Sequence, residues 1–131
     1  KNILFSFMTK YKTINLTCDK SQINRVLNNL FKNAIEALTE QKKKKILVQV
    51  NKTNNKKYFE ILIEDNGEGF PIDKQKLFEP YITNKDNGSG LGLAICKKII
   101  EEHNGDISLF KSRFSGGGVR ILFPVKKRIS A

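Results

Sequence analysis

The chain contains few of the residues that mark several classes of protein. Among its 131 residues are two cysteines, three prolines and one histidine. Cys18 and Cys96 form no metal-type cluster, and nothing in their spacing supports a disulfide. We therefore expect Cys18 and Cys96 to be buried free thiols in a reducing compartment. The low proline content, with 39% hydrophobic and 28% charged residues, excludes a disordered chain and predicts one globular domain over residues 1–131.

The chain also lacks a long apolar run and a balance of charge. No hydrophobic stretch approaches the ~20 residues that cross a membrane, and the opening KNILFSFMTKYK is too interrupted for a signal peptide, so we expect a soluble, cytoplasmic chain. The formal net charge is +11, which would suit a nucleic-acid or anionic lipid surface. However, only four of the 24 basic residues are arginines, and the lysines are scattered apart from the run Lys42–Lys45. That distribution favours a solvated, lysine-rich surface over a nucleic-acid-binding module.

Hydrophobic periodicity predicts the order of the elements. Alternating apolar residues indicate strands over 3–7, 13–18, 45–50, 58–65, 106–112 and 117–125. Helical spacing predicts one long helix after an N-cap at Asp19, a short one over 73–78 and another over 91–103. Consecutive hairpins, the first joining 3–7 to 13–18, imply a mixed, mostly antiparallel sheet. The single apolar face of each long helix implies an α+β two-layer sandwich with helices covering one face of the sheet.

A glycine-rich stretch, GSGLGLAI, precedes the last predicted helix. Gly88, Gly90 and Gly92 fall on alternate residues, so their backbone N–H groups and the helix N-terminus could approach an anion. The spacing fits neither the dinucleotide fingerprint G-x-G-x-x-G nor the Walker loop, which ends in Gly-Lys-Ser/Thr. Without other evidence, a glycine-rich hinge explains the stretch equally well.

Two further stretches carry polar residues at suggestive positions. In EDNGEGF, Asp65 ends a strand and Gly67 and Gly69 follow, so its carboxylate could accept a hydrogen bond from a ligand amine; an ordinary Asx-turn explains the same pattern. On the first long helix, Asn29 and Asn33 are one turn apart. Asn33 borders the apolar stripe, and its amide oxygen suits a hard cation such as Mg²⁺, although a solvated asparagine is the alternative.

These stretches, taken in order, resemble a known family. NRVLNNLFKNAIEAL, EDNGEGF, KLFEPYITNK, GSGLGLAI and GGGVRILFPV are similar to the N, G1, F, G2 and C-terminal glycine boxes of bacterial sensor histidine kinases. These kinases share a superfamily with gyrase, Hsp90 and MutL, and the resemblance covers about residues 13–125. LFEPYITNK followed by GLGLAICKKIIEEHNG is most similar to the nitrogen-regulation type of sensor kinase. The resemblance implies a Bergerat-type ATP-binding fold and a chain that is a fragment of a larger kinase.

The resemblance implies roles at the matching positions. Asp65 would accept the adenine amino group, and Gly67 and Gly69 would leave room for the purine. Asn33 would hold Mg²⁺ bridging the phosphates, and Asn29 would support the phosphate or metal from one turn earlier. Lys32 and Lys85 would bind phosphate. Gly88, Gly90 and Gly92 would let a lid close over the triphosphate, with the backbone of Leu91 donating to it. Phe78 and Tyr81 would anchor the lid or meet the partner domain.

The function implied by the resemblance is phosphoryl transfer in two-component signalling. The domain would bind Mg-ATP and donate the γ-phosphate to a histidine on a separate dimerisation domain, with a response regulator downstream. His103, in EEHNG, lacks the surroundings of the family's acceptor box, so we expect a structural or surface role for it. The acceptor would lie on dimerisation helices absent from this chain. We expect this piece to be monomeric and its parent to be a homodimer, with the kinase part on the cytoplasmic side of a membrane-bound sensor.

Two alternatives and one departure from the family pattern stay open. A gyrase-like or Hsp90-like ATPase places a glutamate general base at the position of Asn29, which cannot activate water as a carboxylate can. A serine kinase that antagonises a sigma factor would transfer the phosphoryl group to a serine of its partner rather than to a histidine. A hydroxyl residue often stands in the last glycine box, whereas this chain has glycine at 116–118. We therefore interpret those glycines as a hairpin turn outside the site.

Overall fold

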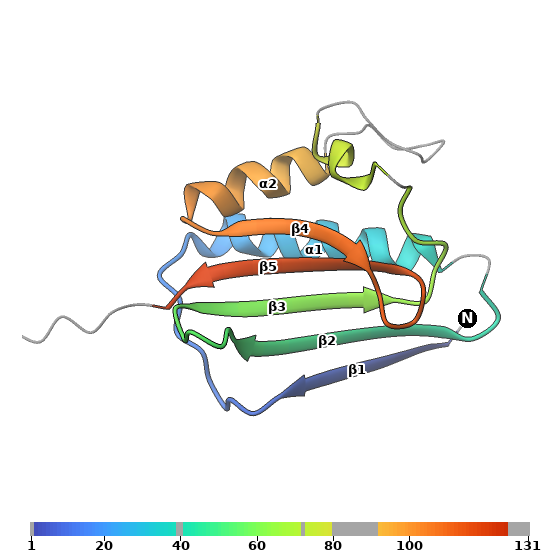
Figure 1. Cartoon of the computed structure of the whole chain (residues 1–131), viewed down its shortest axis with the longest axis horizontal. Helices are drawn as coiled ribbons and strands as arrows, with labels where there is room; N and C mark the ends of the chain where they lie inside the picture. Colours follow the sequence, from blue (N-terminus) through green and yellow to red (C-terminus); the bar gives the residue numbers. More distant parts are fainter. Residues whose placement is uncertain (1, 39–40, 72, 80–91, 126–131) are drawn as a thin grey trace, which may run out of the picture.

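The computed structural model describes residues 2–38, 41–71, 73–79 and 92–125, which form one five-stranded sheet with helices packed on one face (Figure 1). This arrangement confirms the predicted α+β sandwich. Within the described residues, no helix is long and apolar enough to cross a membrane. The elements in chain order are β1 (Ile3–Thr9), α1 (Lys20–Ala37), β2 (Lys44–Lys52), β3 (Tyr58–Asp65), the 3₁₀ helix η1 (Lys74–Phe78), α2 (Gly92–Glu102), β4 (Asp106–Lys111) and β5 (Gly117–Pro124).

The sheet is mixed, with strand order β1-β2-β3-β5-β4. β1 and β2 pair in parallel, because α1 carries the chain back between them, and the other three pairs are antiparallel. The predicted strand over 13–18, and the hairpin it would form with β1, are wrong: these residues join no strand. Leu16 packs against the core from outside the sheet. Apolar residues alternate with polar ones in this segment because one side of it lies on the core. The alternation does not indicate hydrogen bonding to a strand of the sheet.

The helix α1 forms where its N-cap and apolar spacing predict. The Asp19 carboxylate accepts hydrogen bonds from the Gln22 N–H, at 3.1 Å, and the Ser21 hydroxyl, at 2.8 Å. These bonds, the backbone one foremost, lower the pKa of Asp19 because they stabilise its charged form. One face of α1 buries Val26 and Leu30 against the sheet. The amphipathic pattern thus sets which side of the helix meets the strands.

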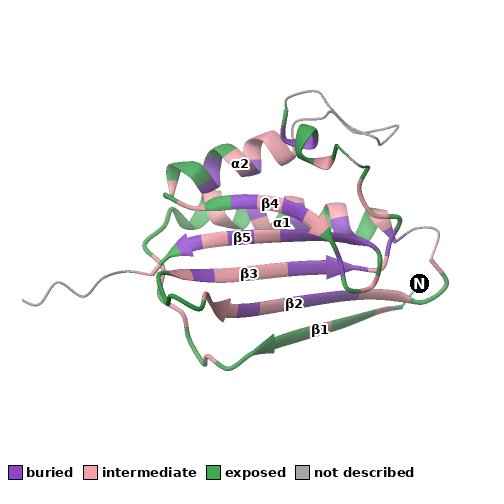
Figure 2. Cartoon of the chain, viewed as in Figure 1, coloured by how far each residue is buried: buried purple, intermediate pink, exposed green. Residues whose placement is uncertain are grey.

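The core lies between the sheet and the two α-helices. Figure 2 shows buried residues concentrated on β2, β3, β5 and β4, while the edge strand β1 is largely exposed. β2, β3 and β5 present alternate residues to the helices, as their predicted period of two requires. The most deeply buried apolar side chains, each at most 1% exposed, are Val26, Leu30, Leu38, Ile46, Cys96, Ile100 and Ile121.

The two cysteines have different environments. Cys96 lies in the core on α2, where burial raises the pKa of its thiol to about 11. Cys18 is exposed immediately before the N-cap of α1, so the prediction of a buried thiol is right for Cys96 and wrong for Cys18. Residue 18 precedes a helix that starts at the surface, and no partner strand covers it.

The single histidine joins the two helices at the end of the molecule where α1 begins. The Nε2 atom of His103 accepts a hydrogen bond from the backbone N–H of Asp19 at 3.0 Å. Its Nδ1 atom lies 2.7 Å from the Ile99 carbonyl oxygen and donates to it, because Nε2 is already the acceptor. Both ring nitrogens are therefore engaged within the fold, which agrees with the structural role expected for this residue.

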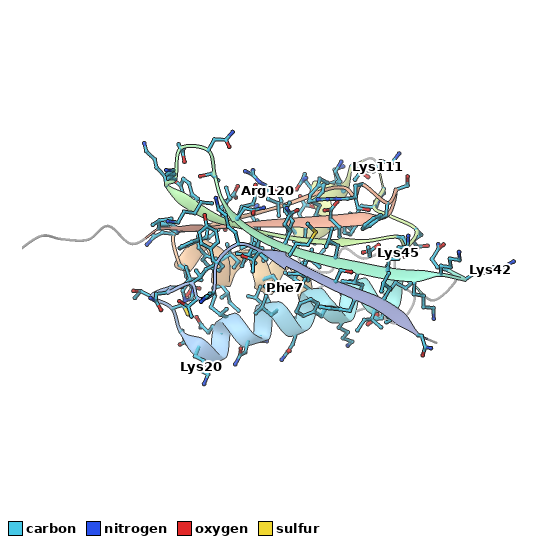
Figure 3. The ribbon with its side chains drawn as sticks, turned by 90° about the horizontal axis from the view of Figure 1, so that it is seen from below. Phe7, Lys20, Lys42, Lys45, Lys111 and Arg120 are labelled. Carbon is cyan, nitrogen blue, oxygen red and sulfur yellow. The ribbon has the colours of Figure 1, made fainter. Side chains whose placement is uncertain are left out.

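The basic residues are spread over the surface. In Figure 3, Lys20 lies at the start of α1, whereas Lys42 and Lys45 lie at the opposite end of the molecule, at the start of β2. Arg120 lies on β5, on the face of the sheet away from the helices, and pairs with Glu60. This distribution matches the scatter of lysines in the sequence.

Candidate functional site

The carboxylate of Asp65 is the centre of the candidate site. Asp65 is the last residue of β3 and is only 6% exposed. Its Oδ1 accepts the N–H of Gly67 at 2.8 Å and the N–H of Gly117 at 3.1 Å. Within the part of the chain that the structure describes, its Oδ2 receives no hydrogen bond. One oxygen is thus fixed by the backbone, and the other is available to a donor on a ligand.

The environment of Asp65 goes beyond a local turn. The bond from Gly67 does make an Asx-turn, as the simpler interpretation of EDNGEGF predicts. A local turn does not account for the second donor, Gly117, which comes from β5. Burial raises the pKa of Asp65, and the two backbone hydrogen bonds oppose that rise. The fold therefore keeps a buried acidic group at a strand end, which is a common feature of functional sites.

The two glycines after Asp65 are required by the fold itself. A Cβ atom at Gly67 would lie 2.4 Å from the carbonyl oxygen of Ala37, so the end of α1 packs directly on this turn. Gly69 has a φ of +81°, in the left-handed region that side chains disfavour. These positions bring the C-terminal end of α1 beside the end of β3. Their predicted role in admitting a purine stays a prediction.

The predicted residues of α1 occupy two sides of the helix. Asn29, Asn33 and Ala37 are spaced by one turn and share a side, and Ala37 touches Gly67. Asn29 is half-buried, and it lies close enough to Cys96 of α2 for its side chain to oppose the rise in the pKa of that thiol. Asn33 is half-buried one turn nearer the end of β3, whereas Lys32 is exposed. The contact between Ala37 and Gly67 thus places the C-terminal part of α1, which carries Asn33, at the end of β3, which carries Asp65. Figure 1 shows these ends of α1 and β3 at the same end of the molecule.

Most of the predicted lid lies outside the described residues: Tyr81, Lys85, Gly88, Gly90 and Leu91. Its two ends are described. Gly92 is the first residue of α2, and a Cβ atom there would meet no atom of the described residues within 4 Å. Phe78, at the end of η1, is 7% exposed and belongs to the core. The start of the predicted lid is therefore attached to the core through Phe78.

The turn between β4 and β5 lies against Asp65, so the hairpin turn predicted at Gly116–Gly118 adjoins the candidate site. A Cβ atom at Gly116 would lie 2.3 Å from the Asp65 carbonyl oxygen and 2.6 Å from the Gly67 nitrogen. A Cβ atom at Gly117 would lie 2.9 Å from the Phe70 ring. The sequence signal was the run of glycines itself, since a turn with no close neighbour does not need three of them. Its partner could not be found from spacing, because Asp65 lies on another strand.

The same turn contacts the opposite face of the sheet through Arg113. The Glu64 carboxylate is 2% exposed; it accepts the backbone N–H of Arg113 at 2.9 Å and its Nε at 3.0 Å. A second guanidinium nitrogen lies 2.8 Å from the same carboxylate and donates to the Gln49 side chain. Successive strand residues point to opposite faces, so the turn contacts Glu64 on one face and Asp65 on the other.

Replacing Arg113 with alanine is expected to lower the free energy of unfolding by about 2 kcal/mol, because it leaves the buried Glu64 carboxylate with fewer partners. The matched control is Arg120→Ala, whose partner Glu60 is more exposed, at 20% against 2%. We expect that control to cost less than about 1 kcal/mol. Urea unfolding followed by circular dichroism measures both, and equal losses in the two variants would contradict the importance of the buried pair.

A separate surface hollow contains none of the predicted site residues. It has a volume of about 410 Å³ and lies at the far end of β2, where Lys10, Lys52 and Arg120 line part of its wall. The hydrogen bonds and burial of Asp65, rather than the size of a hollow, therefore define the candidate site. The predicted lid that would cover the candidate site falls outside the described residues.

Comparison with known families identifies the family to which this fold belongs. The family model described as "Histidine kinase-, DNA gyrase B-, and HSP90-like ATPase" matches residues 18–129, which is most of the chain. The chain belongs to this family. Within it, the similar proteins are sensor histidine kinases, which confirms the predicted resemblance.

Three of these relatives show the extent of the similarity. A sensor histidine kinase of Rickettsia bellii described as NtrY-like is 39% identical over 127 residues, which cover 96% of this chain and 20% of that protein. The alginate biosynthesis sensor protein KinB of Pseudomonas aeruginosa is 37% identical over 113 residues, 84% of this chain and 18% of that protein. The catalytic domain of histidine kinase ThkA superposes with a TM-score of 0.82 at 34% identity, covering 94% of this chain and 80% of that one. The NtrY-like relative supports the predicted nitrogen-regulation type, and this chain spans about a fifth of the length of such relatives.

Proposed function

We propose that this domain binds Mg-ATP and donates the γ-phosphate to a histidine on a separate dimerisation domain of the same parent protein. A response regulator would then receive the phosphoryl group. On this proposal the chain is the catalytic domain of a larger homodimeric sensor kinase and works on the cytoplasmic side of the membrane. The observation that carries the proposal is the buried carboxylate of Asp65, with one oxygen fixed by the backbone.

Asp65 is suited to recognise adenine. Its Oδ1 is saturated by the N–H groups of Gly67 and Gly117, so the orientation of the carboxylate is set before any ligand binds. The remaining oxygen, Oδ2, can accept from the exocyclic amine of adenine. Guanine has a carbonyl oxygen at the corresponding position, and two acceptors facing each other repel. This arrangement would favour ATP over GTP.

The phosphates would lie toward the end of α1 and the start of α2. An amide oxygen is a suitable ligand for Mg²⁺, and Asn33 is half-buried on the side of α1 that faces Gly67. Asn33 would hold the metal ion, which would neutralise charge on the phosphates when bound. Lys32 and Lys85 would add positive charge. The lid glycines Gly88, Gly90 and Gly92, with the backbone of Leu91, would donate N–H groups to the triphosphate.

The phosphoryl acceptor is best placed outside this chain. His103 is its only histidine, and both of its ring nitrogens form hydrogen bonds within the fold. A phosphoryl group on either nitrogen would remove one of these bonds. The contacts of His103 therefore support an acceptor histidine on another domain, in line with the family to which the chain belongs.

The identity of residue 29 favours phosphoryl transfer over hydrolysis. Asn29 stands where related ATPases carry a general base, but an amide cannot remove a proton from water. Its side chain also lies near the thiol of Cys96 on α2 and opposes the rise in the pKa of that thiol. A domain without a base at this position would hydrolyse ATP slowly and keep the γ-phosphate for its acceptor.

The proposal is tested with ATP labelled at the γ-phosphate, in the presence of Mg²⁺. The chain is incubated alone and with the histidine-containing dimerisation domain of its parent protein. We expect no label on the chain alone and acid-labile label on the added domain. The control is the same domain with its acceptor histidine replaced by alanine, which should stay unlabelled.

Three results would contradict this proposal. Stoichiometric label on this chain would show that it carries its own acceptor. Steady release of inorganic phosphate without transfer would support the ATPase alternative, and acid-stable label on a partner would support a serine kinase.

A further inference from the structure

The hydroxyl of Ser112 lies at the centre of the turn that meets Asp65. Ser112 follows the last residue of β4 and is 4% exposed. Its Oγ donates to the backbone carbonyl of Asp65 at 2.6 Å. The same oxygen accepts the N–H of Phe114 at 3.0 Å and of Gly116 at 3.1 Å. One donor and two acceptor sites are all that a hydroxyl offers, so this side chain is fully used within the fold.

These bonds fix the turn against the end of β3. The backbone N–H of Ser112 also donates to the carbonyl of Gly116 at 3.0 Å, which closes the turn on itself. Gly116 then lies so near Asp65 that a Cβ atom would meet the Asp65 carbonyl oxygen at 2.3 Å. The next residue, Gly117, presents its N–H to Oδ1 of the carboxylate. The position of that donor therefore depends on Ser112.

We propose that Ser112 is a positioning residue for nucleotide recognition: it holds the β4–β5 turn so that the Gly117 N–H fixes the Asp65 carboxylate for the adenine amine. This inference rests on the proposed function. Without the hydroxyl, the Phe114 and Gly116 N–H groups lose their acceptor and the Asp65 carbonyl loses a donor. The turn then loosens, and Oδ1 keeps only the local bond from Gly67. The carboxylate can rotate, so binding a ligand has to reorient it, and the loss of its rotational freedom weakens the affinity.

A purely structural serine would behave differently from a positioning serine. Loss of a structural bond lowers stability and weakens the binding of every nucleotide to a similar degree. Loss of carboxylate orientation acts on the amine contact alone. Inosine triphosphate separates these cases, because it carries an oxygen where ATP carries the amine and is otherwise the same size.

The experiment compares Ser112→Ala with Ile107→Val. Ile107 is a core residue of β4, 4% exposed, so its substitution also costs stability but does not contact the turn. We expect Ser112→Ala to reduce the ratio of ATP affinity to inosine triphosphate affinity by about tenfold, as measured by calorimetry. Ile107→Val should leave that ratio unchanged. Ser112→Cys, which keeps the volume but bonds weakly, should fall between the wild-type chain and the alanine variant.

A second measurement tests Ser112 without nucleotide. Amide hydrogen exchange of Gly117 reports its bond to Asp65, and we expect Ser112→Ala to speed it by about tenfold relative to Ile107→Val. A wild-type chain that does not prefer ATP over inosine triphosphate would overturn the proposed function. The exchange rate of the Gly117 amide would still test whether Ser112 holds the β4–β5 turn. Unchanged exchange would overturn the proposal, whatever the affinity ratio. Faster exchange with an unchanged ratio would reduce Ser112 to a structural residue and overturn it too.

Discussion

Replacing Asp65 with asparagine is expected to weaken ATP binding about a hundredfold, because it turns an acceptor into a donor where the adenine amine would bind. The Oδ1 position receives two backbone N–H groups, from Gly67 and Gly117. The asparagine must therefore place its carbonyl oxygen there and its NH₂ group at the Oδ2 position. That NH₂ group would face the amine of adenine, so two donors would meet.

The variant should remain folded, which makes the binding result interpretable. Burial raises the pKa of Asp65, so the folded chain disfavours its charged form, and a neutral amide removes that cost. We expect unchanged or higher stability in thermal unfolding. Isothermal titration calorimetry measures the affinity, with Asp73→Asn as the control, because Asp73 is exposed and, within the described residues, its carboxylate pairs with the exposed Lys76 alone. Wild-type ATP affinity in the Asp65 variant would remove the adenine assignment.

Replacing Gly116 with alanine is expected to lower the free energy of unfolding by about 3 kcal/mol and to abolish nucleotide binding. The new Cβ atom would lie 2.3 Å from the Asp65 carbonyl oxygen and 2.6 Å from the Gly67 nitrogen. Both neighbours are backbone atoms in or beside β3, so neither can move without opening the end of the sheet. The substitution would therefore separate the turn from the strand that it holds.

Two other glycines give a graded control for this stability measurement. A Cβ atom at Gly117 would meet the Phe70 ring, a side chain that can shift, so alanine there should cost about 1 kcal/mol. A Cβ atom at Gly92 would meet no atom of the described residues within 4 Å, so alanine should leave stability unchanged or raise it by about 0.5 kcal/mol. Urea unfolding gives all three values. A Gly116→Ala chain as stable as the Gly92→Ala chain would show that the backbone contact has no energetic consequence.

The elements with strong local signals could be predicted from the sequence. The apolar spacing and N-cap of α1 and the alternation of β2 and β3 depend on neighbours within the same segment. The segment 13–18 was misassigned because its alternation comes from packing on the core. No local pattern shows that β1 pairs in parallel with β2, since α1 separates the two strands in the sequence.

The candidate site also contains residues that could be predicted from the sequence and residues that could not. Asp65 at the end of a strand and Asn33 at the border of an apolar stripe follow from periodicity, and the Ala37–Gly67 contact brings the ends of their two elements together. Ser112 and Gly116 were missed because their partner, Asp65, lies on another strand. A serine between two strands has no distinctive sequence pattern, so only the fold reveals what its hydroxyl binds.

The contacts of the β4–β5 turn also bear on how this chain can vary in evolution. A loop between two strands is usually where a domain tolerates insertions and deletions. Here, Ser112 is bonded to the Asp65 backbone and Arg113 to the Glu64 side chain, on opposite faces of the sheet. One added residue would shift the register of at least one of these contacts. We therefore expect few insertions or deletions in this loop, because a change in its length would break contacts on both faces of the sheet.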